Sequence, residues 1–198
     1  MTQSLAQILY QLQLAEQQKA AARRKCFISY YSGDQAEVET FLEDFGDVFI
    51  PKVIGVTDGD DFIDSTNTDY VMSRVRAKYL GDSTVTILLI GSCTHSRRYI
   101  DWELKTSLRQ GEYVPNGLLG LTLPYKNGTA HLPPRFKENW KADGSGYALY
   151  QSYPTSKEQL RGWIEDAFNR RTTHAHLIKN AQEMHKYNRQ CEIHQLTH

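Results

Sequence analysis

Residues 84–90 read TVTILLI, a run of apolar and β-branched side chains bounded by Asp82 and Gly91. A strand that is apolar on both faces is typical of a parallel sheet with helices on both sides. The stretch therefore predicts a central, fully buried strand, and this strand decides the class of fold.

Strand and helix patterns alternate on both sides of this stretch. Strands are predicted at 25–30 (KCFISY), 49–56, 118–123 and 148–153, and Pro51 indicates that the first part of the second strand is an edge or entry segment. Apolar residues at helical spacing predict helices at 34–46, 70–80, 98–110 and 156–169. The alternation predicts a doubly wound α/β fold with a mainly parallel sheet.

The two ends of the chain and one internal segment complete the predicted organisation. Residues 1–24 have leucine and isoleucine at i, i+3, i+4 and i+7 spacing, which predicts a helix. Residues 125–147 predict a packed loop, and residues 175–189 predict a last helix. The chain is thus divided into an N-terminal helix (1–24), an α/β domain (25–170) and a C-terminal helix and tail (171–198).

The composition excludes several classes of partner. The 198 residues include 23 Lys and Arg against 23 Asp and Glu, and this zero net charge disfavours binding to polyanions. No window of about 20 apolar residues could span a bilayer, and glutamines interrupt the region where a signal peptide would be apolar. We expect a cytoplasmic protein that binds neither nucleic acid nor membrane.

Charge is nevertheless distributed unevenly along the chain. Residues 34–69 contain eleven acidic residues and one lysine, whereas residues 70–124 contain seven basic and four acidic residues. Such runs usually lie on solvated surface. Because oppositely charged surfaces also favour self-association, we expect a homo-oligomer.

Ligands of an open α/β sheet bind beyond the carboxyl ends of its strands. Three predicted loops meet there, at 29–34, 57–64 and 91–98. None carries a glycine-rich phosphate-binding motif, and the chain lacks the HExxH and GxSxG patterns of zinc peptidases and serine hydrolases. The common nucleotide-binding and hydrolase machineries are therefore poorly supported.

Glu103 lies in the predicted helix that follows the third loop. Tyr99 precedes it by four residues and so shares its helical face, while Arg97 and Arg98 lie one turn nearer the loop. A carboxylate beside an aromatic ring suits cleavage of a glycosidic bond, because the carboxylate stabilises an oxocarbenium ion and the ring covers a planar base. The same spacing also arises by chance on surface helices.

Three separated blocks of this sequence together resemble a TIR domain of the bacterial TIR-like group found in Thoeris antiphage defence. The blocks are KCFISY at 25–30, IGSCT at 90–94 and SRRYIDWE at 96–103, and the likeness spans about residues 25–124. Members of the family usually have Trp four residues before the glutamate, where this chain has Tyr99, with Trp102 next to Glu103 instead. The resemblance implies a flavodoxin-like fold.

The resemblance also implies an activity, cleavage of the nicotinamide–ribose bond of NAD to give ADP-ribose or a cyclic isomer. NAD is then the substrate, no cofactor or metal is implied, and the product would signal to a responsive effector protein. Seven residues are predicted to form the site: Glu103 as the catalytic residue, Ser29, Tyr31 and Ser92 in substrate positioning, Tyr99 as the ring face, and Arg97 and Arg98 facing the pyrophosphate.

Other interpretations stay open. A TIR module that assembles with partners and turns over nothing would have the same fold and appendages, and a ribosyltransferase or nucleoside hydrolase of similar fold is a further alternative. A receiver-like phosphoacceptor is weaker, because residues 29–31 (SYY) stand where an acidic pair would bind magnesium. Zinc at Cys191 and His194 lacks a second pair of ligands, and Cys93 is expected to have a packing role.

Overall fold

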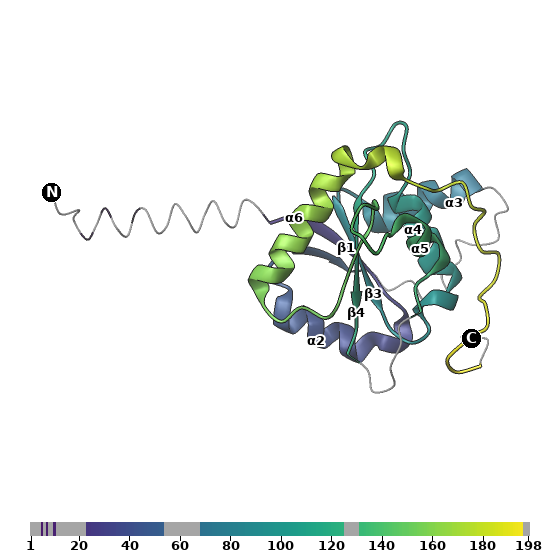
Figure 1. Ribbon diagram of the computed structural model, residues 1–198, viewed down its shortest axis with the longest axis horizontal. Coiled ribbons are helices and arrows are strands. Elements are labelled where there is room, and N and C mark those ends of the chain that lie inside the picture. The colour runs from purple at the N-terminus through teal and green to yellow at the C-terminus, as the bar shows by residue number, and fades with distance from the viewer. Residues whose placement is uncertain are drawn as a thin grey trace.

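A computed structural model describes Leu5, Gln7, Tyr10 and residues 23–53, 68–124 and 131–195. These residues form a parallel sheet in the order β2-β1-β3-β4-β5, made of β1 (Lys25–Ser29), β2 (Ile50–Val53), β3 (Val85–Ile90), β4 (Gly117–Thr122) and β5 (Leu149–Gln151). Helices lie on both faces of the sheet (Figure 1). The predicted α/β fold is confirmed, and β2, which contains Pro51, lies at one edge of the sheet.

β3 lies at the centre of the sheet, as its sequence predicted. All six of its residues are buried, and it pairs in parallel with β1 on one side and with β4 on the other. The hydroxyl oxygens of Thr86 and Ser107 lie 2.7 Å apart, so this buried polar group of the strand has a hydrogen-bond partner.

The helices bury an apolar layer on each face of the sheet. α2 (Gln35–Phe45) and α6 (Lys157–Thr173) cover one face, where Phe41 and Ile164 belong to the same cluster as Leu89 of β3. The opposite face is covered by α3 (Thr68–Val75), α4 (Arg98–Ser107) and α5 (Pro134–Asn139), where Leu104 and Phe136 cluster with Leu88 of β3. A π-helical turn (Arg76–Leu80) extends α3 to Gly81.

Two elements on this second face differ from their prediction. α4 ends at Ser107 and not at residue 110 as predicted. Leu108 caps this end, and its backbone N–H donates to the carbonyl of Leu104. Residues 134–139, predicted as part of a packed loop, form α5, which starts at a proline. Phe136 of α5 is fully buried and lies so close to Gly120 of β4 that a Cβ there would overlap its ring.

The C-terminal segment is where the prediction was wrong. A helix was expected at 175–189, but α6 is followed by one 3-10 turn (Ala175–Leu177) and then by non-helical chain, named here the C-terminal strap (178–195). The strap is the yellow trace that runs beside α4 and α5 in Figure 1. Its backbone bonds to side chains of the domain: the Trp102 indole donates to the His185 carbonyl, and the His185 N–H donates to Asp101.

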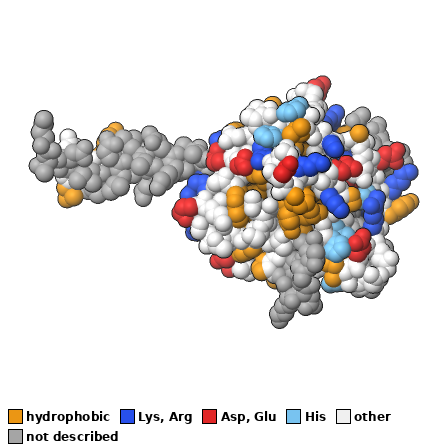
Figure 2. All heavy atoms as spheres, viewed as in Figure 1, with side chains coloured by type: hydrophobic (Ala, Val, Ile, Leu, Met, Phe, Trp, Pro, Cys, Tyr) orange, Lys and Arg blue, Asp and Glu red, His pale blue; other side chains and the backbone are white. Residues whose placement is uncertain are grey.

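Two predicted segments lie mostly or wholly outside the described residues. Of the N-terminal helix (1–24), Leu5, Gln7 and Tyr10 are described and are helical, and the loop at 57–64 is not described. Within the described ranges, no helix combines the length and the apolar surface needed to cross a bilayer. Basic and acidic side chains are interspersed over the face shown in Figure 2. The predicted domain boundaries stay a prediction.

Candidate active site

The carboxyl end of β1 meets the helix that follows β3. Ser29 is the last residue of β1, and Glu103 lies in the second turn of α4. The Ser29 hydroxyl donates a hydrogen bond to Glu103 Oε2 at 2.6 Å, and the two side chains are almost completely buried. The parallel order of the strands therefore joins a hydroxyl and a carboxyl from two distant blocks of the sequence.

A small pocket adjoins this pair. It is lined by aromatic, polar and charged side chains: Tyr30, Tyr31, Ser32, Arg97, Tyr99, Ile100 and Glu103. Its volume is about 20 Å³, which is room for about one water molecule. Five of the seven predicted site residues meet here, four in the lining and Ser29 through its bond to Glu103. Tyr30, Ser32 and Ile100 also line the pocket and were not among the predicted site residues.

Burial dominates the electrostatics of Glu103. Loss of hydration raises the pKa of its carboxyl to about 8, and the hydrogen bond from Ser29 opposes part of that rise. The carboxyl of the free protein is therefore mostly protonated at neutral pH. A cation bound next to Glu103 would shift it toward the ionised form. Strongly shifted carboxyls in pockets are typical of functional sites.

Tyr99 is held in place by its neighbours on α4. Its ring meets the Trp102 ring edge to face, with 5.6 Å between the centroids. The Arg98 guanidinium lies 4.8 Å from the Tyr99 ring centroid and donates a hydrogen bond to the phenol oxygen at 2.9 Å. Tyr99 therefore presents a fixed ring to the pocket, with Trp102 as its support.

The two adjacent arginines have different environments. Arg97 lines the pocket, is 5% exposed, and lies with its guanidinium 3.8 Å above the Tyr31 ring centroid. Arg98 lies outside the lining and is bound to the C-terminal strap, because its backbone N–H donates to Asn188 and its side chain to the Lys186 carbonyl. The structure therefore brings Arg97, and not Arg98, into the candidate site.

Ser92 is the other predicted residue that lies outside the pocket lining. Its backbone carbonyl accepts a weak hydrogen bond from the Cys191 thiol of the strap at 3.6 Å. The neighbouring Cys93 is buried, and burial raises the pKa of its thiol to about 12. A thiol so protonated is a poor nucleophile, which agrees with the packing role expected for Cys93.

A buried ion pair attaches α4 to the C-terminal strap. The guanidinium of Arg135, in α5, donates two hydrogen bonds to the Asp101 carboxylate, at 2.9 and 3.2 Å, and both side chains are buried. Arg135 also donates to the carbonyls of Gln182 and Glu183 in the strap. Nothing in the sequence pattern indicated this pair, because Arg135 lies in a segment predicted as loop.

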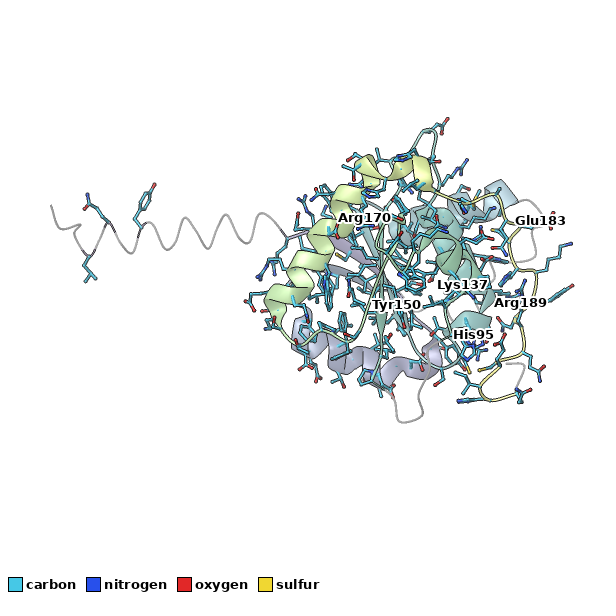
Figure 3. All side chains as sticks on the ribbon, in the orientation of Figure 1. His95, Lys137, Tyr150, Arg170, Glu183 and Arg189 are labelled. Carbon is cyan, nitrogen blue, oxygen red and sulfur yellow. The ribbon has the colours of Figure 1, made fainter. Side chains whose placement is uncertain are left out.

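The far end of the strap packs against the loop that follows β3. The rings of His95 and His131 lie 5.1 Å apart, and the backbone N–H of Glu192 donates to His95 Nε2 at 3.3 Å. Figure 3 labels His95 together with the strap residues Glu183 and Arg189. Among the described residues, no three His, Cys, Asp or Glu side chains come together as metal ligands.

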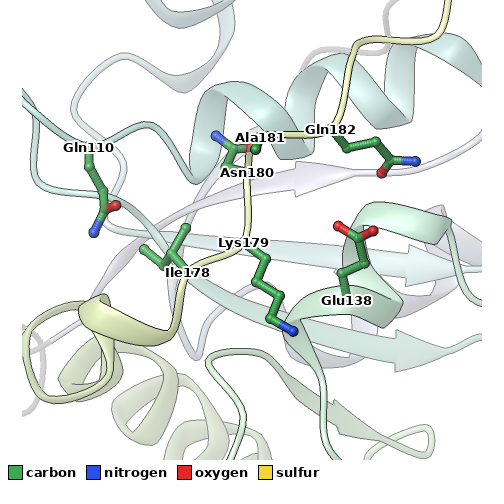
Figure 4. Close-up of a pocket in the computed structure, with 7 residues that line it drawn as sticks. All are labelled: Gln110, Glu138, Ile178, Lys179, Asn180, Ala181 and Gln182. Atoms are coloured by element: carbon green, nitrogen blue, oxygen red, sulfur yellow. The ribbon is translucent and has the colours of Figure 1, made fainter.

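A wider groove lies between the start of the strap and α5 (Figure 4). It is lined by Gln110, Glu138 and residues 178–182. These side chains offer amides, one carboxylate and one ammonium group, but no aromatic ring and no hydroxyl. The pocket at Glu103 is therefore the better candidate for an active site.

The part of the chain that forms this pocket matches a known protein family. The family model described as the TIR-like domain of the Thoeris protein ThsB matches residues 27–127, just over half of the chain. The matched segment includes Ser29, the loop after β3 and Glu103. Comparison with curated proteins gives no match.

Proposed function

The chain belongs to the TIR-like domain family of the Thoeris protein ThsB, and from this premise we propose that it cleaves the nicotinamide–ribose bond of NAD. The products would be nicotinamide and either ADP-ribose or a cyclic ADP-ribose isomer. In antiphage defence this product would act as the signal for a responsive effector protein, and the enzyme would act as a homo-oligomer.

The observation that carries the proposal is the buried pair of Ser29 and Glu103 in an aromatic pocket. The Ser29 hydroxyl holds one oxygen of the Glu103 carboxyl at 2.6 Å, and both side chains are almost completely buried. A carboxylate fixed in a water-poor site stabilises a nearby positive charge far more than it would in water. The pair therefore suits a reaction that passes through an oxocarbenium ion.

The proposed reaction proceeds by loss of nicotinamide from the ribose carbon C1′. The bond between C1′ and the ring nitrogen breaks, and its electron pair goes to the nicotinamide, which leaves as a neutral molecule. Positive charge develops on the ribose, where ionised Glu103 stabilises it. Water, or another hydroxyl of the same molecule, then attacks C1′ and loses its proton.

The substrate itself favours the active form of Glu103. The nicotinamide ring of NAD carries a positive charge, and a neighbouring cation lowers the pKa of a carboxyl. Binding would therefore ionise a Glu103 whose pKa is raised to about 8 in the free protein. The Tyr99 ring, which contacts Trp102 and lines the pocket, would contact a flat ring of the substrate.

The small volume of the pocket favours a second candidate function, a TIR module that assembles without catalysis. A pocket of about 20 Å³ does not hold a dinucleotide, so NAD would enter only if side chains at its mouth moved. Tyr31 and Arg97 are the lining residues that stack on each other. In the assembly module, Glu103 would be a protonated residue of the packed interior.

Chromatography of the products separates these two functions. The full chain is incubated with NAD over a series of protein concentrations, because self-association would complete an oligomeric enzyme. We expect nicotinamide together with ADP-ribose or a cyclic isomer, in equal molar amounts. Unchanged NAD at every concentration, including those at which sedimentation shows oligomers, would support the assembly module instead.

A further inference from the structure

Arg97 carries a buried positive charge that its own protein does not neutralise. The residue is 5% exposed and lines the pocket with Glu103. None of its three guanidinium nitrogens has a hydrogen-bond partner among the described residues. Buried guanidinium groups normally bond to carboxylates, phosphates or carbonyls, because loss of hydration is otherwise uncompensated.

Contacts with neighbouring side chains hold Arg97 without satisfying its donors. The guanidinium stacks on the Tyr31 ring at 3.8 Å, which fixes its plane, and its three nitrogens are buried without a hydrogen-bond partner among the described residues. A Cβ at Gly33 would overlap the Tyr31 ring, so the glycine permits the ring to lie there. The stack with Tyr31 therefore holds Arg97 in the ligand-free protein, and this stack would open when a ligand enters.

The nearby acidic groups are engaged elsewhere or are only partly charged. Burial raises the pKa of the Asp34 carboxyl to about 6, although the positive charge of Arg97 acts to lower it. The Asp34 side chain also accepts a hydrogen bond from Thr94. Glu103 accepts a hydrogen bond from Ser29. Burial raises the pKa of the Glu103 carboxyl, and this hydrogen bond opposes part of the rise. Among the described residues, neither carboxylate is hydrogen-bonded to a guanidinium nitrogen of Arg97.

We propose that Arg97 binds a phosphate group of the substrate and makes the site selective for phosphorylated nicotinamide ribosides. The proposal rests on the proposed function, since it places the ribose at Glu103 and the phosphate attached to that ribose at Arg97. A guanidinium offers two parallel N–H donors, which match two oxygens of a phosphate. Arg98, which bonds to the strap, takes no part.

Two ligands that differ only in this phosphate provide the test. Nicotinamide mononucleotide and nicotinamide riboside carry the same ring and the same ribose, and only the first has a 5′-phosphate. Calorimetry measures the affinity of the full-length protein for each ligand. If the protein cleaves them, every protein compared carries Glu103→Gln so that the ligands stay intact.

The expected result is a preference for the mononucleotide of about 10- to 100-fold, the range for charge-assisted hydrogen bonds. Arg97→Met should abolish the preference by weakening mononucleotide binding alone. Arg97→Lys, which keeps the charge but loses the planar pair of donors, should retain part of it. Arg161→Met, the same change on the exposed surface of α6, should leave it intact.

A second readout distinguishes a ligand-binding arginine from a structural one. Because Arg97→Met removes a buried charge without hydrogen-bond partners, it should keep or raise the Tm of the ligand-free protein. A preference that persists in Arg97→Met, a parent protein that binds both ligands equally, or no mononucleotide binding at millimolar concentration would each overturn the proposal. So would loss of the preference in Arg98→Met alone.

These outcomes are independent of NAD cleavage. If the parent protein prefers the mononucleotide through Arg97 but releases no nicotinamide, the phosphate site stands and the proposed activity fails. If the parent protein releases nicotinamide but Arg97→Met keeps the preference, the activity stands and the phosphate site fails.

Discussion

At the scale of single residues, Glu103 meets two conflicting demands. Burial removes water from the carboxyl, and a carboxylate in such a site would stabilise a developing cation more strongly. The same burial raises the pKa of the carboxyl to about 8, which disfavours the charge that the reaction needs. The positive ring of NAD would resolve the conflict by favouring ionised Glu103 in the complex.

The pH dependence of NAD cleavage follows from this conflict. Protonated Glu103 stabilises a cation poorly, so kcat/KM should be low in acid and rise with pH, with a midpoint near the free-protein pKa of about 8. The midpoint in kcat should lie lower, because the bound cationic ring lowers the pKa. Initial rates between about pH 5.5 and 9.5 measure both profiles. A kcat/KM that stays flat across this range contradicts the role of ionised Glu103.

The stability of Glu103→Gln should depend on pH in the same region. The unfolded carboxyl ionises near 4.5, whereas the folded one keeps its proton up to about pH 8. Between these values the folded parent binds the extra proton, so its stability falls as pH rises, by at most about 1.4 kcal/mol per pH unit. Glutamine does not titrate, so the Tm of Glu103→Gln minus the Tm of the parent protein should increase from about pH 5 to 8 and then level off. A pH-independent difference in thermal melts would count against the buried carboxyl.

Local spacing identified part of the site and could not identify the rest. Glu103 and Tyr99 share a helical face by periodicity alone, and this face is the one that lines the pocket. Spacing did not separate Arg97 from Arg98, because the packing of α4 on the sheet decides which of two adjacent side chains points inward. The contact of Glu103 with Ser29 joins two segments that are far apart in the sequence, so it could be located only once the strand order was known.

At the scale of elements, α4 is attached to the sheet on one side and to the C-terminal strap on the other. Residues 175–189, most of which belong to the strap, were predicted as a helix, and they contain neither glycine nor proline. In the structure the backbone groups of the strap bond to Trp102, Asp101 and Arg135 instead. Tertiary hydrogen bonds therefore override local helix propensity in this segment.

The ion pair between Asp101 and Arg135 should contribute far more to stability than a surface pair does. Asp101→Asn removes the charge but leaves the buried guanidinium of Arg135 in place, so we expect a loss of about 3–5 kcal/mol in the free energy of unfolding. Lys157→Ala breaks the exposed pair with Asp47 and should change stability little. Urea denaturation of both variants measures the contrast. Equal effects would show that the buried pair does not hold the strap to α4.

Two glycines on neighbouring elements should respond oppositely to alanine. A Cβ at Gly117 of β4 would overlap the backbone carbonyl of Ala167 in α6, so Gly117→Ala should push the helix off the sheet and cost about 1–3 kcal/mol. Gly162 lies on the exposed side of α6 with open space around it, so Gly162→Ala should stabilise by about 0.5–1 kcal/mol. Chemical denaturation measures both changes, and stabilisation by Gly117→Ala would refute the close packing.

At the scale of the whole molecule, the fold followed from β3. A strand that is apolar on both faces is stable only in the middle of a sheet covered on both sides, and the alternation of strands and helices fixed the remaining layers. Function depends on fewer residues than the fold does. The family match and the pocket at Glu103 support NAD cleavage, and catalysis itself is the property to measure.

The rate of nicotinamide release from NAD should be compared between the parent protein, Glu103→Gln and Glu43→Gln. The last variant makes the same chemical change on the exposed surface of α2. We predict that the parent and Glu43→Gln release nicotinamide at the same rate, and that Glu103→Gln is slower by at least about 100-fold. Release of nicotinamide by Glu103→Gln at the parental rate would contradict the assignment of Glu103 as the catalytic residue.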